Sequence, residues 1–241
     1  MKVLIFDTKA QAIGRVVEVI SRQLRDKGDS VLGLATGGTM EPVYAGLIVA
    51  FAEGRVRFSD ATTFNLDEYV GLSPTHPQSY RDFMQKNLFD QLNIEHSRTH
   101  VPDGRALDFA AYCRHYEQLI KAAGGIDLQL LGIGNNGHIG FNEPGKAFTY
   151  STSLTTLAQS TIDANKRFFD SIDQVPRQAL SMGIGTIMEA REIMLLALGS
   201  DKKDAIHGLV KGPVTPWLPA SILRFHQHVT LLLDEAAAAR I

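Results

Sequence analysis

The sequence predicts an α/β fold in which a mostly parallel, doubly wound sheet is flanked by helices. Two observations predict it: at least six apolar runs of strand length are present, and segments with helical hydrophobic spacing separate them. Parallel strands need crossover connections, so this alternation indicates the βαβ units of a Rossmann-like sheet. The length of 241 residues, 44% of them hydrophobic, suits a single domain over residues 1–241.

The elements follow one another in a regular order along the chain. The expected strands are Lys2–Phe6, Val31–Ala35, Ala61–Leu66, Asp127–Gly134, Arg191–Leu198 and His228–Leu233. The first helix begins after Thr8, a candidate N-cap, and the second begins at Glu41 and Pro42, because proline favours a first turn. Further helices are expected at residues 80–92, 108–123 and from about Ser200.

The composition excludes several classes of partner. The chain has 24 basic and 26 acidic side chains, so its formal charge of -2 gives no field that favours nucleic acid or an anionic membrane. The single cysteine, Cys113, cannot form an internal disulfide, and we expect a cytoplasmic protein. The longest uncharged apolar stretch, Val43–Ala52, is about half of the roughly 20 residues that span a bilayer, so no membrane segment is expected.

A glycine-rich turn lies between the second predicted strand and its helix. In Thr36-Gly37-Gly38-Thr39 the glycines allow a ligand to approach the backbone, and the free amides and dipole of the following helix attract an anion such as phosphate. A tight turn without any ligand also explains the Gly-Gly pair. The motif is neither a G-x-G-x-x-G nor a Walker sequence, so it does not indicate a nucleotide.

Two adjacent carboxylates, Asp67 and Glu68, follow the third predicted strand. Their side chains should point in different directions, so one of the two is expected to face a site. The alternative is a solvated loop acid or a helix cap.

The densest polar motif follows the strand that ends near Gly134. Residues 132–145 include His138 and Glu143 among glycines and asparagines, a combination that folding stability rarely requires. A histidine with a nearby glutamate can move protons near neutral pH, although a lone histidine is more often structural. Later in the chain, Arg167 and Lys202 are basic residues, and Lys202 stands at a predicted helix start, where a cation is unfavourable unless an anion is also bound.

These motifs closely resemble the glucosamine-6-phosphate deaminase family over essentially the whole chain. The resemblance includes the Thr36–Thr39 loop and the segments Phe64–Gly71, His76–Tyr80, Gly137–Pro144, Phe168–Asp170 and Leu198–Ser200. The 6-phosphogluconolactonases share the fold and the Gly-His motif, but they typically have Asp-Glu-Arg where this chain has Asp67-Glu68-Tyr69. The chain therefore resembles the deaminases more than the lactonases.

The resemblance implies conversion of glucosamine 6-phosphate to fructose 6-phosphate and ammonia, with no cofactor and no metal. It implies that His138, Glu143 and Asn136 open the sugar ring and that Asp67 moves a proton from C2 to C1. The expected phosphate ligands are Gly37, Gly38, Thr39, Arg167 and Lys202. The sequence alone leaves open whether Asp67 or Glu68 is the base.

Some positions differ from the pattern of other family members. Asn136 stands where many members have Asp, and an amide cannot relay a proton, so an orienting role is expected. The allosterically activated, hexameric members carry an Arg and a Lys at the positions of Ser153 and Thr155, which implies no activation by N-acetylglucosamine 6-phosphate and a monomer or small homo-oligomer. The polar segment from about residue 145 to 173 is the expected lid over the sugar.

Three alternatives to the deaminase remain. A lactonase on the same fold would use His138 to activate water and would depend less on Asp67. A sugar-phosphate sensor would bind the phosphosugar without turnover, and it should carry a basic helix-turn-helix module. A purely structural role leaves the Gly137–Pro144 segment unexplained.

Overall fold

The computed structural model describes all residues, 1–241, and contains one large sheet and one small one. The seven strands of the large sheet are all parallel and lie in the order β1-β10-β9-β6-β2-β3-β5. Their bounds are β1 Lys2–Phe6, β2 Val31–Leu34, β3 Thr62–Asn65, β5 Thr99–His100, β6 Leu128–Leu131, β9 Glu192–Ala197 and β10 Val229–Asp234. The predicted doubly wound α/β fold is therefore confirmed.

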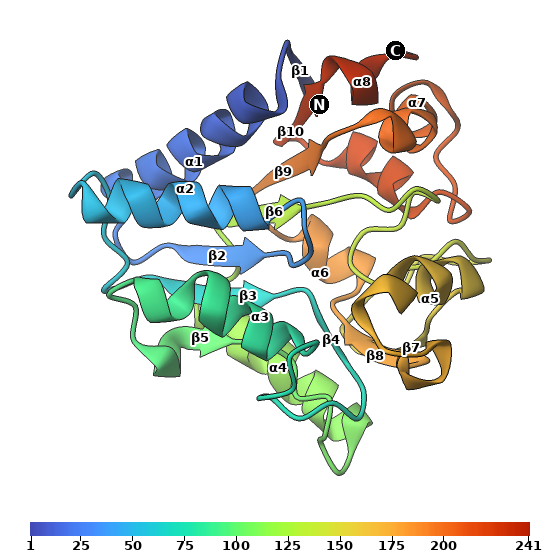
Figure 1. The fold of residues 1–241 in the computed structure, drawn as a ribbon, viewed down its shortest axis with the longest axis horizontal. Coiled ribbons are helices and arrows are strands. Elements are labelled where there is room, and N and C mark those ends of the chain that lie inside the picture. Colours follow the sequence, from blue (N-terminus) through green and yellow to red (C-terminus); the bar gives the residue numbers. More distant parts are fainter.

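Helices connect these strands, and α1, α2, α3, α4 and α7 are the ones that the hydrophobic spacing predicts. The helices are α1 Lys9–Asp26, α2 Glu41–Ala52, α3 Tyr80–Asn87, α4 Phe109–Ala122, α5 Gln159–Asn165, α6 Ile184–Met188, α7 Lys203–Lys211 and α8 Glu235–Ala238. Thr8 caps α1 as predicted, because its hydroxyl accepts from the N–H of Gln11 while the Gln11 side chain accepts from the N–H of Thr8. In Figure 1, α1 and α2 lie side by side along the large sheet, and both chain ends lie at the same side of the molecule.

A small antiparallel sheet lies beyond the carboxyl ends of the large one. It consists of β4 Asp67–Tyr69, β8 Gln178–Ser181 and β7 Ser153–Thr156, in that order. In Figure 1 the arrowheads of β2 and β3 point toward the side on which β7, β8 and α5 lie. The expectation of a single strand over 61–66 misses the point where the chain leaves the large sheet, at Leu66.

Seven strands and α-helices have no counterpart among the elements expected from the sequence: β4, β5, β7, β8, α5, α6 and α8. β5 has only two residues, and β7 alternates half-buried and exposed positions in a Ser/Thr-rich sequence without an apolar run. Both are defined by pairing with a neighbouring strand, which local hydrophobic spacing does not reveal.

Two hydrophobic clusters stabilise the two sheets. A cluster of 51 buried residues packs the large sheet against its helices. A second cluster of six buried residues packs the small sheet against the segment between β7 and β8. It comprises Tyr69, Phe141, Leu157, Ile162, Val175 and Ala179. No helix combines the length and the apolar character needed to cross a bilayer.

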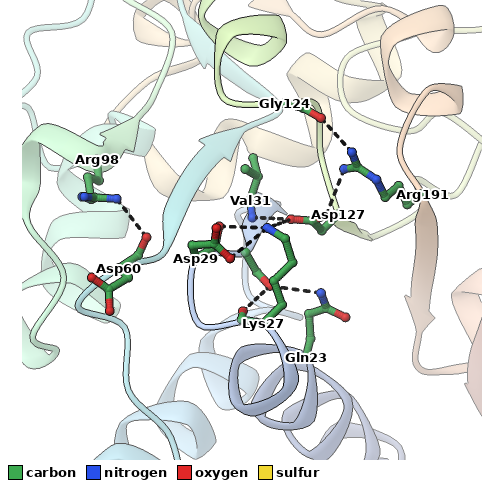
Figure 2. Close-up of polar contacts among 10 residues, drawn as sticks. Gln23, Lys27, Asp29, Val31, Asp60, Arg98, Gly124, Asp127 and Arg191 are labelled. Carbon is green, nitrogen blue, oxygen red and sulfur yellow. Dashed lines mark hydrogen bonds and ion pairs between the residues drawn. The ribbon is translucent and has the colours of Figure 1, made fainter.

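The amino ends of the central strands are held by a charged network, shown in Figure 2. Asp127, buried just before β6, accepts hydrogen bonds from the Val31 N–H at 2.8 Å, the Lys27 ammonium at 2.9 Å and the Arg191 guanidinium at 2.9 Å. These three donors precede or begin β2 and β9, so one carboxylate aligns three neighbouring strands. The network lies at the amino ends of the strands, whereas the polar motifs follow their carboxyl ends.

Candidate active site

The polar motifs at the carboxyl ends of the strands meet around one cavity of about 640 Å³. It lies where ligands bind in open parallel sheets. Eight of the nine residues predicted as site residues line it: Gly37, Gly38, Thr39, Asp67, Asn136, His138, Arg167 and Lys202. The ninth, Glu143, lies behind His138 and contacts it.

One end of the cavity is suited to an anion. Gly37 has a φ of 95°, which favours glycine, and the loop leads into the N-terminus of α2. Lys202 lies opposite, after β9, and its ammonium donates to the side-chain oxygen of Asn135. Arg167 comes from the turn after α5, and its guanidinium stacks on the Phe168 ring with its centre 4.7 Å from the ring centroid.

The two cations at this end influence each other electrostatically. Burial lowers the pKa of the Lys202 ammonium, Asp201 acts in the opposite direction, and the charge of Arg167 lowers it further. An anion between Lys202 and Arg167 would relieve that repulsion. The arrangement therefore favours a dianionic group such as a phosphate ester.

Asp67 forms another wall of the cavity. It is only 6% exposed, and burial together with the nearby charge of Glu68 raises the pKa of Asp67 to about 8. A carboxylate with such a pKa is a stronger base than an ordinary aspartate, so it is suited to accept a proton from carbon. Glu68 does not line this cavity, because successive side chains of β4 point to opposite sides.

The third group of the site is the pair His138 and Glu143. Nδ1 of His138 lies 3.4 Å from Oε2 of Glu143, and the same oxygen accepts from the Asn136 side-chain amide at 3.0 Å. The Asn136 oxygen in turn accepts from the His138 backbone N–H at 3.2 Å, so Asn136 braces the pair. Asn136 thus contacts both residues of the pair, and its orienting role stays a prediction.

Glu143 remains ionised although it is largely buried. Burial alone would raise the pKa of Glu143, but His138, Thr161 and Asn136 outweigh it through hydrogen bonds and charge and lower it to about 2. Thr161 comes from α5, and the Ala158 N–H at the start of that helix also points to Glu143, at 3.4 Å. Glu143 thus joins the histidine to the segment that covers the cavity.

Comparison with known proteins shows which family has this arrangement. The family model for glucosamine-6-phosphate isomerases/6-phosphogluconolactonase matches residues 7–232. The chain belongs to this family.

Several family members are similar to it over more than nine tenths of their own length. The glucosamine-6-phosphate deaminase of Thermoanaerobacter sp. (strain X514) is 48% identical over 100% of this chain and 95% of its own. The glucosamine-6-phosphate deaminase of Rhodopirellula baltica is 54% identical over 95% of this chain and 91% of its own. A solved monomeric glucosamine-6-phosphate deaminase superposes with a TM-score of 0.97 at 44% identity, covering 100% of both chains.

Solved structures from the lactonase branch of the family resemble this chain in fold at much lower identity. The 6-phosphogluconolactonase of Trypanosoma cruzi superposes with a TM-score of 0.78 at 18% identity, over 100% of this chain and 96% of its own. The resemblance to the deaminases that the sequence motifs indicate is thus confirmed.

Many residues around the cavity were not predicted as site residues, and three of them have polar side chains placed beside the predicted groups. Tyr80 lines the wall beside Asp67, Asn135 holds the Lys202 ammonium, and Thr161 donates to Glu143. A signal existed for two of them, since Tyr80 ends the His76–Tyr80 motif and Asn135 lies within the Gly-rich motif. Nothing in the local sequence distinguishes Thr161 from the other Ser and Thr residues around it.

No three His, Cys, Asp or Glu side chains come together in the structure as a potential metal-binding group.

Proposed function

We propose that this chain is a glucosamine-6-phosphate deaminase, which converts glucosamine 6-phosphate and water to fructose 6-phosphate and ammonia. One observation carries the proposal: a single cavity joins an anion-binding end to two separate proton-transfer groups, Asp67 and the His138–Glu143 pair. Opening a sugar ring and shifting a proton between two carbons are different proton transfers, and each needs a group of its own. The deaminases that match the whole chain at 48–54% identity support the same assignment.

The phosphate is expected at the end formed by the Gly37–Thr39 loop. Backbone N–H groups there are free for an anion, and Arg167 and Lys202 supply two positive charges. Binding at this end would direct the sugar carbons toward Asp67 and His138. The phosphate then acts as the handle that fixes the reacting carbons relative to both groups.

Ring opening is assigned to His138. The imidazole takes the proton from the anomeric hydroxyl and delivers one to the ring oxygen, so that the C1–O5 bond breaks and a C1 aldehyde forms. Ionised Glu143 stabilises the imidazolium that exists between the two transfers, because its carboxylate lies 3.4 Å from Nδ1. Asn136 holds this pair in place through its bonds to both residues.

Proton transfer between carbons is assigned to Asp67. Its carboxylate removes the C2 proton, which the aldehyde acidifies, while the C1 oxygen gains a proton and the substrate ammonium loses one, which gives a neutral enolamine. The Asp67 carboxyl then returns its proton to C1. The product is an imine at C2, whose carbon is attacked by water, and the C–N bond then breaks to release ammonia and leave the C2 ketone. The substrate ammonium would favour the ionised form of Asp67, whose pKa in the free site is about 8.

The segment of about residues 145–173 is proposed to act as the lid of a single domain. α5 and the turn after it place Ser160, Thr161 and Arg167 on the cavity wall, and the second hydrophobic cluster connects this segment to Tyr69 and Phe141. Closure would bring Arg167 to the phosphate and keep Thr161 on Glu143. We propose that the protein is a monomer, because the solved deaminase that superposes on it is monomeric.

The deciding experiment measures ammonia and fructose 6-phosphate released from glucosamine 6-phosphate by purified, chelator-treated protein. Equal amounts of the two products are expected, without added metal. The same preparation is offered 6-phosphogluconolactone, which it should not hydrolyse faster than buffer without protein. Lactone hydrolysis without ammonia release would transfer the chain to the lactonase branch, and binding of the phosphosugar without either reaction would identify a sensor.

A further inference from the structure

Glu68 follows the proposed base directly in β4 but has no part in the reaction described above. Asp67 faces the 640 Å³ cavity, whereas Glu68 faces a separate cavity of about 230 Å³ on the other side of the strand. Glu68 is 3% exposed, and no lysine or arginine forms an ion pair with it. A buried carboxylate without a cation requires another reason for its position.

The Glu68 carboxylate is held entirely by backbone N–H groups. Oε1 accepts from Tyr69 at 2.8 Å and from Tyr80 at 3.0 Å, and Oε2 accepts from Arg81 at 2.9 Å. Tyr80 and Arg81 are the first two residues of α3, whose N–H groups have no partner within the helix. The carboxylate therefore connects the start of α3 to the strand that carries Asp67.

The side chain of Tyr80 returns to the reaction cavity. Tyr80 lines its wall, its ring packs on Tyr69 and Phe141 at centroid distances of 4.9 and 6.0 Å, and its hydroxyl donates to that of Tyr69 at 3.3 Å. Two walls of the cavity, Asp67 and Tyr80, thus belong to residues whose backbones one carboxylate holds together.

We propose that Glu68 is a positioning residue for the proton transfer: by fixing β4 to the N-terminus of α3, it sets the Asp67 carboxylate against the Tyr80 wall at the distance that the sugar carbons require. This inference rests on the proposed role of Asp67. Glu68 acts from outside the cavity and never contacts the substrate.

Replacement by glutamine separates this role from simple space filling. A carboxylate offers acceptors on both oxygens, whereas the glutamine amide offers one oxygen and turns an NH2 group toward the remaining backbone N–H. At least one of the three bonds must then break, and the strand shifts relative to α3. A displacement of the base by about 1 Å costs on the order of 100-fold in rate, so kcat is expected to fall about 100-fold while KM changes less than about threefold, because the phosphate site is untouched.

Glu117 provides the matched control. Its Oε1 also accepts three hydrogen bonds, from the N–H and hydroxyl of Thr152 and the hydroxyl of Thr186, but it does not line the reaction cavity. Glu117→Ala, which removes all three bonds, should lower the unfolding temperature with kcat within about threefold of the wild-type value. The same fall of kcat in both variants would reduce Glu68 to a general structural role.

The test compares the wild-type protein with Glu68→Gln on glucosamine 6-phosphate with hydrogen or deuterium at C2. Glu68→Gln is expected to have a lower kcat than the wild type. Its primary isotope effect should be at least as large as that of the wild type, since proton abstraction limits its rate. Unchanged kcat, or an isotope effect reduced to unity, would overturn the proposal. If Glu68→Gln does not fold, Glu68→Asp, which sets both oxygens back by one methylene, replaces it. The same changes in kcat and in the isotope effect are then expected of Glu68→Asp.

Failure of this inference is distinct from failure of the proposed function. A wild-type protein that releases no ammonia contradicts the function, and an Asp67→Asn variant with full turnover contradicts the base. An active wild type, an inactive Asp67→Asn variant and a fully active Glu68→Gln variant together contradict only the positioning role.

Discussion

Asp67→Asn should abolish turnover and at the same time stabilise the folded protein above neutral pH. In the folded chain, burial and the charge of Glu68 raise the pKa of Asp67 from 3.8 to about 8, and no hydrogen bond or cation offsets them. The folded state therefore disfavours the ionised form that the reaction needs. Asparagine has nearly the same shape but no charge, so it removes this conflict together with the base.

The sign and size of the effect follow from the linkage between proton binding and folding. Because the folded pKa is raised, the folded state holds its proton while the unfolded state loses it, and wild-type stability falls as the pH rises from about 4 to about 8. The slope is about 1.4 kcal/mol per pH unit, which over four units sets a ceiling of about 5 kcal/mol. Water entering the cavity and relaxation around the carboxylate reduce this, and about 2 kcal/mol at pH 8 is the expected gain for Asp67→Asn.

Urea unfolding of both proteins at pH 4.5, 6 and 8 measures this gain. The difference in unfolding free energy should be small at the lowest pH and should grow with each step. Asp26→Asn is the control, since Asp26 is an exposed carboxylate, and its difference from the wild type should not change with pH. If Asp67→Asn changes the unfolding free energy by the same amount at all three pH values, the conclusion that burial raises the pKa of Asp67 is refuted.

The remaining predictions concern the other parts of the site. His138→Gln should slow reaction of the closed sugar by about 100-fold and that of an analogue unable to cyclise much less, and equal losses in a direct rate comparison would remove His138 from ring opening. Lys202→Met should raise KM for the phosphosugar by roughly 30-fold with a small change in kcat, while Lys203→Met, an exposed neighbour, leaves both unchanged. Thr161→Val should lower kcat about tenfold through loss of its bond to Glu143, and Thr161→Ser should restore it; an active valine variant would show that this bond is dispensable.

The sequence predicts the large sheet well because its strands are apolar and separated by helices with clear caps. Thr8, Pro42 and Asp108 each stand at the start of a helix that the structure contains. Motifs at the strand ends also locate the cavity, since parallel strands bring their carboxyl ends together. The placement of Glu143 behind His138, and not on the cavity wall, depends on how residues 137–145 fold back, which no spacing rule gives.

The small sheet is where local sequence information fails, and it is also what places the base. Ser153–Thr156 has no apolar period, and its partner β8 pairs on its other edge with β4, which is more than 100 residues away in the chain. Only that long-range pairing shows that Asp67 continues into a second sheet at the rim of the cavity. From the sequence alone, Asp67 and Glu68 are equivalent candidates for the base. The pairing of β4 with β8 fixes which of the two side chains faces the cavity, and it is Asp67.

A close approach at Gly140 brings the two proton-transfer groups to one cavity. Gly140 has a φ of 55°, and a Cβ there would lie 3.5 Å from Oδ2 of Asp67 and 3.2 Å from Oγ of Ser181. The Ser181 hydroxyl already accepts the N–H of Phe141 at 3.0 Å, so the loop that carries His138 is bonded to β8 directly beside β4. A larger residue at 140 would be strained at this φ, and its Cβ would press on the Ser181 hydroxyl. At Gly140 the backbone of the loop that carries His138 therefore lies against the Asp67 carboxylate, so the group assigned to ring opening and the group assigned to proton transfer can share one substrate.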